Sequence, residues 1–206
     1  MSQTNGRPVN AEEFDQAWKV FCEIGQLERH FNELESRYRA LASTWLLATF
    51  AGAGFVLSQQ SLNLPFDRLV LVAVLALAGA TGITLLCTLD LMVYHQLLEA
   101  AYLEGLKMEN TYQWLPRVRS NMMQAMKKRG LLARIALFYV FGDAILLLTG
   151  GAALTAWMWK RSLWLGLAGA SGTLVVTILL CVGLYLWTVN SFKQLRAAIG
   201  VAAAHK

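Results

Sequence analysis

Charged residues and prolines are scarce in this sequence. Of its 206 residues only 15% are charged and 56% are hydrophobic, and none of the three prolines lies in a long apolar stretch. This composition excludes an ordinary soluble globular domain and indicates a membrane protein. The length leaves room for one compact helical bundle and little else.

Sequence motifs of catalytic, metal-binding and disulfide-bonded sites are missing as well. The three cysteines, Cys22, Cys87 and Cys181, have no C-x-x-C spacing, so neither a disulfide framework nor a zinc site is predicted. No H-E-x-x-H, G-x-S-x-G or phosphate-loop motif is present, and the histidines are isolated. The charged first 40 residues do not resemble a cleaved secretory signal. We therefore predict no catalytic residue, no metal, no cofactor and no enzymatic activity.

Four apolar stretches are present instead, at 41–57, 69–89, 135–159 and 162–192. The second has 21 uncharged residues, about 31 Å of helix, which matches a hydrocarbon core of roughly 30 Å. Pro65 lies between the first two stretches, and little more than Lys160 and Arg161 separates the last two. We predict an all-α membrane protein with four transmembrane helices arranged as two hairpins.

The distribution of positive charge predicts the orientation. Fifteen of the eighteen Lys and Arg residues lie before the first stretch, between the second and third, or after the fourth. Such residues concentrate on the cytoplasmic side, so both termini are expected there, in a bacterial inner membrane. The predicted organisation is a cytoplasmic amphipathic helix (1–40), hairpin one (41–94), a cytoplasmic helical basic segment (95–134), hairpin two (135–192) and a cytoplasmic tail (193–206).

The N-terminal segment carries large apolar residues at steps of three or four. This spacing is typical of an amphipathic helix, which the first span could simply continue. Trp18, Phe21 and Phe31 are the predicted contacts with another subunit or a partner. The whole stripe is Phe14, Trp18, Phe21, Ile24, Leu27, Phe31, Leu34, Tyr38 and Leu41.

Asp143 interrupts the third stretch, and no span carries a basic residue to pair with it. One hypothesis is a ring of Asp143 side chains lining a cation pore in a homo-oligomer. The alternative is a protonated Asp143 hydrogen-bonded to Tyr139, Thr173 or Thr177. Asp90 follows the second stretch directly, where we expect a hydrated carboxylate at the membrane rim, near His95.

A basic cluster in the central segment is a candidate site for a phosphorylated ligand or for anionic lipid headgroups. The alternative is that these charges only reflect the cytoplasmic side of the membrane. The cluster consists of Arg117, Arg119, Lys127, Lys128 and Arg129.

Small residues four apart occur in every span and predict close helix packing, either within one chain or between subunits. The pairs are Ala48 and Gly52, Ala78 and Gly82, Ala152 and Ala156, and Ala168 and Gly172.

Three segments give the chain an architectural resemblance to the small membrane effectors of bacterial antiphage systems, of the CBASS, Pycsar and SLATT type. They are Tyr38-Arg39-Ala40 before the first span, 89–95 (LDLMVYH) after the second, and 114–119 (WLPRVR) in the central segment. The resemblance covers roughly residues 30–126 and implies an oligomer that a nucleotide signal opens to breach the inner membrane. A typical SLATT protein has two spans rather than four, so no ligand residue is carried over.

Two functions are thus expected. The first is an oligomeric effector or ion-conducting pore in the lipid membrane, gated by a nucleotide or nucleic-acid signal from a neighbouring gene product. The second is a non-conducting adaptor that recruits a soluble cytoplasmic partner through the aromatic stripe. A small transporter is a weaker third, because the spans show neither an inverted repeat nor a proline break.

Overall fold

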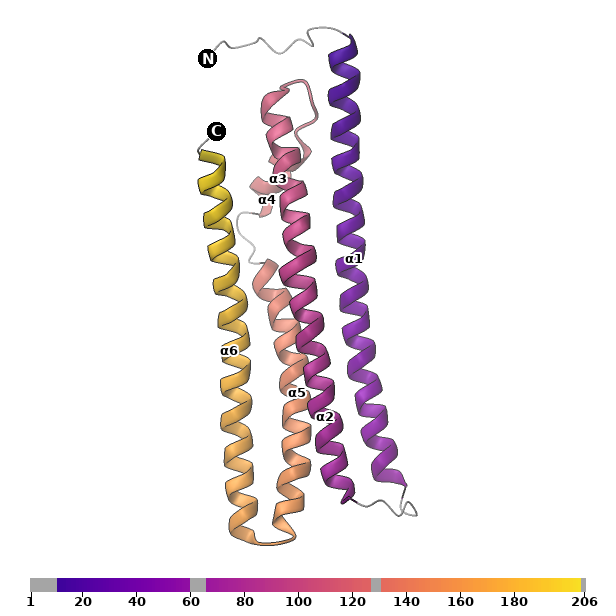
Figure 1. The fold of residues 1–206 in the computed structure, drawn as a ribbon, viewed down its shortest axis with the longest axis vertical. Helices are drawn as coiled ribbons and strands as arrows, with labels where there is room; N and C mark the ends of the chain where they lie inside the picture. Colours follow the sequence, from indigo (N-terminus) through magenta and orange to yellow (C-terminus); the bar gives the residue numbers. More distant parts are fainter. Residues whose placement is uncertain (1–10, 60–65, 127–130, 205–206) are drawn as a thin grey trace. The chain divides into compact units, whose positions relative to one another are not determined.

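A computed structural model describes residues 11–59, 66–126 and 131–204, and every regular element in these ranges is a helix (Figure 1). The elements are α1 (Ala11–Ser58), α2 (Arg68–Leu89), the π-helix η1 (Asp90–Tyr94), α3 (His95–Thr111), α4 (Val118–Met126), α5 (Leu131–Trp159) and α6 (Leu163–Ala204).

Four of these helical stretches are long and apolar enough to cross a membrane, namely Ala11–Ser58, Arg68–Thr111, Arg134–Trp159 and Leu163–Thr188. The predicted all-helical membrane protein with four candidate spans is thereby confirmed. The hairpin arrangement and the orientation stay predictions. The first span belongs to one helix, α1, which begins well before the apolar stretch, at Ala11.

The chain divides into two compact units. We call Met1–Tyr38 with Leu89–Gly130 the polar unit, and Arg39–Thr88 with Leu131–Lys206 the apolar unit. Each unit is thus assembled from two segments that are distant in the sequence.

Small residues hold the apolar unit together. Its core cluster joins Ala53 and Val56 of α1, Val72 and Ala73 of α2, and Ala153 of α5. α5 and α6 run side by side, joined by a short turn in which the amides of Arg161 and Ser162 both donate to the Met158 carbonyl (Figure 1).

Only some of the predicted small-residue pairs are used within the chain. Gly82 lies against the Trp45 ring, whose Nε1 donates to the Gly79 carbonyl at 3.1 Å. Around Gly172, by contrast, nothing lies within 4 Å of where a Cβ would stand, and Ala152 is exposed. The close approach of α5 to α6 is made at Gly151, against Thr173.

In the polar unit α1 buries only part of the predicted amphipathic stripe, of which Phe21 and Phe31 are half-buried. Its fully buried positions are Ala17, Ile24 and Glu35, and only Ile24 belongs to the predicted stripe. Three stripe members of this unit are exposed, namely Phe14, Trp18 and Leu27, and so is Leu41 at the start of the apolar unit. The inward face of α1 also holds a small residue, Ala17, and a paired acid, Glu35, so large apolar side chains alone do not define it.

A short loop connects α3 to α4. α3 ends at Thr111, where the Tyr112 amide donates to the Met108 carbonyl at 2.8 Å. Pro116 lies in the loop, just before Val118 starts α4. The loop buries Leu115 at 2% exposure, so it is anchored to the interior of the polar unit.

Candidate functional site

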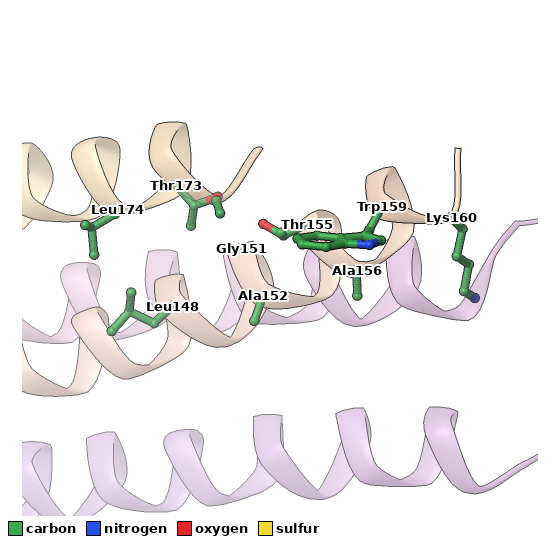
Figure 2. A pocket seen from close by; sticks show the side chains of 10 residues that line it. Leu148, Gly151, Ala152, Thr155, Ala156, Trp159, Lys160, Thr173 and Leu174 are labelled. Atoms are coloured by element: carbon green, nitrogen blue, oxygen red, sulfur yellow. The ribbon is translucent and has the colours of Figure 1, made fainter. Parts of the chain in front are cut away.

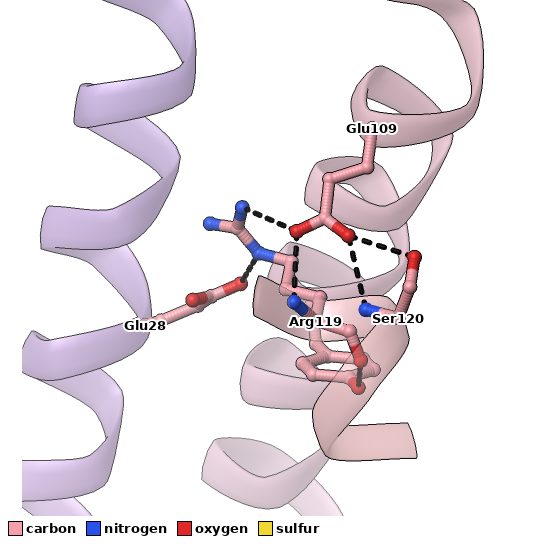
Figure 3. A network of polar contacts seen from close by, with 5 residues as sticks. Glu28, Glu109, Arg119 and Ser120 are labelled. Carbon is pink, nitrogen blue, oxygen red and sulfur yellow. Dashed lines mark hydrogen bonds and ion pairs between the residues drawn. The ribbon is translucent and has the colours of Figure 1, made fainter. Parts of the chain in front are cut away.

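Arg119, at the start of α4, is the centre of a buried ion-pair network in the polar unit (Figure 3). Its side chain is only 5% exposed, and its Nε lies 2.6 Å from Oε1 of Glu28 on α1. Its Nη1 lies 3.6 Å from Oε1 of Glu109 on α3. The guanidinium also stacks over the Phe21 ring, 4.6 Å from the ring centroid. One cation therefore ties α1, α3 and α4 together.

Glu109 caps the first turn of α4 from the preceding helix. Its carboxylate accepts hydrogen bonds from the amides of Arg119 and Ser120, at 2.8 and 2.9 Å, and from the Ser120 hydroxyl at 2.8 Å. Helix N-terminal amides lack intrahelical partners and favour an anion. Burial raises the pKa of Glu109, but these hydrogen bonds and the Arg119 charge outweigh burial and hold the pKa below its ordinary value.

Tyr102 closes the network on the α3 side. Its hydroxyl donates to the Arg119 carbonyl at 2.6 Å. Burial, followed by the charges of Glu109 and Glu28, raises the pKa of the Tyr102 phenol, while Arg119 lowers it. The phenol is therefore a neutral donor at physiological pH.

Only two members of the predicted basic cluster, Arg117 and Arg119, lie in the described part of the chain. Arg119 is buried between two carboxylates, so its charge is already compensated and it is a poor phosphate ligand. Arg117, two residues earlier, is exposed. Lys127, Lys128 and Arg129 lie outside the described residues.

The predicted contact residues of α1 lie in different environments. Trp18 is 42% exposed and stacks between Phe14 and Phe21, at centroid distances of 6.4 and 5.9 Å. Phe14 stacks in turn on Trp114 of the loop at 4.5 Å. Phe21 is half-buried under Arg119, and Phe31 is half-buried beside His30. Of the three predicted contacts, Trp18 alone is exposed.

Asp90 starts η1 and is 0% exposed, so the expectation of a hydrated carboxylate is wrong. His95 is hydrogen-bonded to Glu35, with Nδ1 2.8 Å from Oε1. The Tyr38 hydroxyl donates a hydrogen bond to the Tyr94 hydroxyl at 3.2 Å. π-helical turns within α-helices often mark functional positions. Here the turn directly precedes His95.

Asp143 lies inside α5, nine residues after Arg134, or about 14 Å along the candidate span. Its side chain is buried at 4% exposure, and its Oδ2 accepts a hydrogen bond from the Thr84 hydroxyl of α2 at 2.9 Å. Within the described residues its Oδ1 has no hydrogen-bond partner. The donor is therefore not one of the three hydroxyls that we expected, and the carboxylate faces the interior of the apolar unit.

Searches of protein families, curated proteins and solved structures found no match to this chain. The site must be interpreted from its own residues. Among the described residues, no cluster of three His, Cys, Asp or Glu side chains could hold a metal ion.

The acidic partners Glu28, Glu35 and Glu109, and also Thr84, are not among the site residues predicted from the sequence. A signal for two of them was present. Glu28 and Glu35 are seven residues apart, in step with Phe21, Ile24 and Phe31, so they share the inward face of α1. An acid on an apolar face implies a buried partner. Glu109 and Thr84 carry no comparable signal.

Proposed function

We propose that the protein is an oligomeric effector of the bacterial inner membrane that conducts cations, with Asp143 on the ion path. The observation that carries this proposal is the buried carboxylate inside an apolar helix, with one oxygen bonded to Thr84 and the other without a hydrogen-bond partner in the described chain. A carboxylate at this depth is costly to keep and marks ion or proton paths in many membrane proteins. One neutral hydroxyl compensates only part of that cost.

The bond to Thr84 suggests how the path is closed. In the protomer the Asp143 carboxylate faces α2, so the proposed ring of Asp143 side chains requires this bond to break. Thr84 thus acts as the latch of the resting state, and opening turns the carboxylate toward the pore. The resemblance to antiphage effectors motivates the upstream half of the proposal, a nucleotide or nucleic-acid signal received by the cytoplasmic segments.

If the Thr84 bond holds the path closed, substitutions at Thr84 and at Asp143 should change membrane depolarisation in opposite directions. Expressed in a bacterium and followed with a voltage-sensitive dye, Thr84→Val should depolarise the membrane more than wild type. Asp143→Asn should abolish depolarisation. Ser171→Ala is a matched control, because Ser171 is exposed on α6 and its hydroxyl bonds only to carbonyls of its own helix.

Equal membrane levels of all variants, checked by immunoblot, are required for this comparison. Depolarisation by Asp143→Asn at the wild-type level would refute the proposal. A loss of protein in both Thr84→Val and Asp143→Asn would instead assign the pair a purely structural role and also overturn it.

A second candidate, the membrane adaptor, is favoured by one observation. Phe14 and Trp18 form an exposed aromatic surface on the polar unit, at 37% and 42% exposure. Aromatic residues of this kind dominate protein interfaces. The adaptor predicts an unchanged membrane potential and one stoichiometric soluble protein that co-purifies with wild type and with Lys19→Ser, but not with Trp18→Ser.

A further inference from the structure

The apolar unit contains a groove of about 650 Å³ between α5 and α6 (Figure 2). Its floor consists of the small residues Gly151, Ala152 and Ala156. Ala152 and Ala156 are exposed, so the described chain leaves these two positions of the floor uncovered, whereas Gly151 is buried. The volume lies within the range of small-molecule and cofactor sites.

The chemistry of the groove changes from one end to the other. Leu148 and Leu174 lie at one end, Thr155 lies in the middle, and Trp159 and Lys160 lie at the other end (Figure 2). The apolar end is inside candidate span Arg134–Trp159, and the basic end directly follows it. Tryptophan and lysine at a span end are typical of the membrane interface, where lipid headgroups begin.

We propose that this groove binds one anionic phospholipid, with an acyl chain along Ala152 and Ala156 and the headgroup phosphate at Lys160. The polarity of the lining residues changes along the groove in the same order as the polarity of a phospholipid. The hydrocarbon would lie at the apolar end, the ester region beside Trp159, and the negative charge at Lys160. A lysine at the end of a span attracts the negative charge of a phosphate, which guanidinium and ammonium groups bind by charge-assisted hydrogen bonds.

The charges at this end of the spans favour a lipid over a second copy of the chain. Arg68, Lys160 and Arg161 are accompanied by a single acid, Asp67. Asp67 Oδ2 lies 4.0 Å from Lys160 Nζ, with side chains 35% and 65% exposed. Because this ion pair is long and exposed to solvent, it compensates the positive charge of Lys160 only slightly. A second copy would bring the same cationic excess, whereas a phospholipid brings the missing anion.

The test uses the full chain in vesicles of equal amounts of phosphatidylcholine and phosphatidylglycerol, followed by mild detergent extraction and native mass spectrometry of the retained lipid. Wild type should retain phosphatidylglycerol preferentially, at one per chain. Lys160→Gln should weaken that preference about fivefold, the effect of one lost basic contact. Ala156→Leu should displace both lipids, because its side chain fills the groove.

Matched controls lie nearby. Arg161→Gln removes an equal charge from a residue that stacks on Trp157 and does not line the groove. Ala168→Leu adds the same bulk to an exposed position of α6 outside it. Retention changed equally by the controls, or unchanged in both test variants, would overturn the proposal. So would an oligomer in wild type that Ala156→Leu alone dissociates, because the occupant would then be a second copy. If Ala156→Leu fails to fold, Lys160→Gln still decides, since it replaces an exposed side chain.

Discussion

Glu109 and Arg119 are joined twice, through the Arg119 amide, which donates to Oε1 at 2.8 Å, and through the guanidinium, 3.6 Å from the same oxygen. The hydrogen bond to the backbone amide fixes where α4 begins. The ion pair fixes the position of the Arg119 side chain. Because Arg119 also reaches Glu28 on α1, the start of a nine-residue helix becomes the junction of the polar unit.

Removing this cation should destabilise the polar unit strongly. Arg119→Met leaves Glu28 and Glu109 without their buried counter-charge and should lower the free energy of unfolding by about 3–5 kcal/mol. Urea unfolding in detergent, followed by tryptophan fluorescence, measures it. Arg117→Met is the control and should change stability by less than about 0.5 kcal/mol, because that side chain is exposed. Equal effects of the two variants would contradict the role assigned to Arg119.

The depressed pKa of Glu109 predicts a pH dependence with a definite sign. A carboxylate whose pKa is lower in the folded state adds stability above its ordinary value, and this stability is lost as the pH falls through the folded pKa. The gap in melting temperature between wild type and Glu109→Gln should therefore be largest near neutral pH and shrink in acid. Glu33→Gln should show a small gap throughout, since Glu33 pairs with Arg37 in an exposed position. A gap that widens in acid would refute this assignment.

Gly105 should be intolerant of a methyl group. A Cβ at this position would meet Nε, Cζ and Cδ of Arg119, a side chain fixed by its ion pairs. Gly105→Ala should cost about 1–3 kcal/mol despite the better helix propensity of alanine. At Gly25 the nearest atom, Nη2 of Arg119, is 3.9 Å away. Gly25→Ala should accordingly be neutral or stabilising in the same melting experiment, and the reverse order would show that Arg119 moves aside.

The α5–α6 contact offers a parallel comparison in the apolar unit. A Cβ at Gly151 would collide with the Thr173 side chain, whereas one at Gly172 meets nothing within 4 Å. Gly151→Ala should destabilise the protein by about 1–3 kcal/mol, and Gly172→Ala should not. If neither substitution changes the melting temperature, α6 does not pack on α5 as closely as the contact between Gly151 and Thr173 indicates.

The helical class and the four candidate spans could be predicted because length and hydropathy act locally along the chain. A run such as 69–89 has to be helical in hydrocarbon whatever lies beside it. The partner of Asp143 could not be predicted in this way. Thr84 is 59 residues away, and which of several span hydroxyls faces the carboxylate depends on the rotation and register of two helices.

The polar unit shows a different limit. Large apolar residues recur along α1 at helical spacing, yet two of them, Trp18 and Leu27, are exposed, at 42% and 48%. Glu28 and Glu35 face inward because Arg119 and His95 are there to meet them. Burying a charge is costly unless the charge is paired. The partners of Glu28 and Glu35 follow the second predicted span in the sequence, whereas the two acids precede the first.

The bond between Glu28 and Arg119 joins residues 91 positions apart, with both predicted spans of the first hairpin between them. During synthesis α1 therefore cannot form this ion pair until α2, α3 and the start of α4 have also been made. Completion of the polar unit is thus a late event in the synthesis of the chain, because its first segment has to wait for its second.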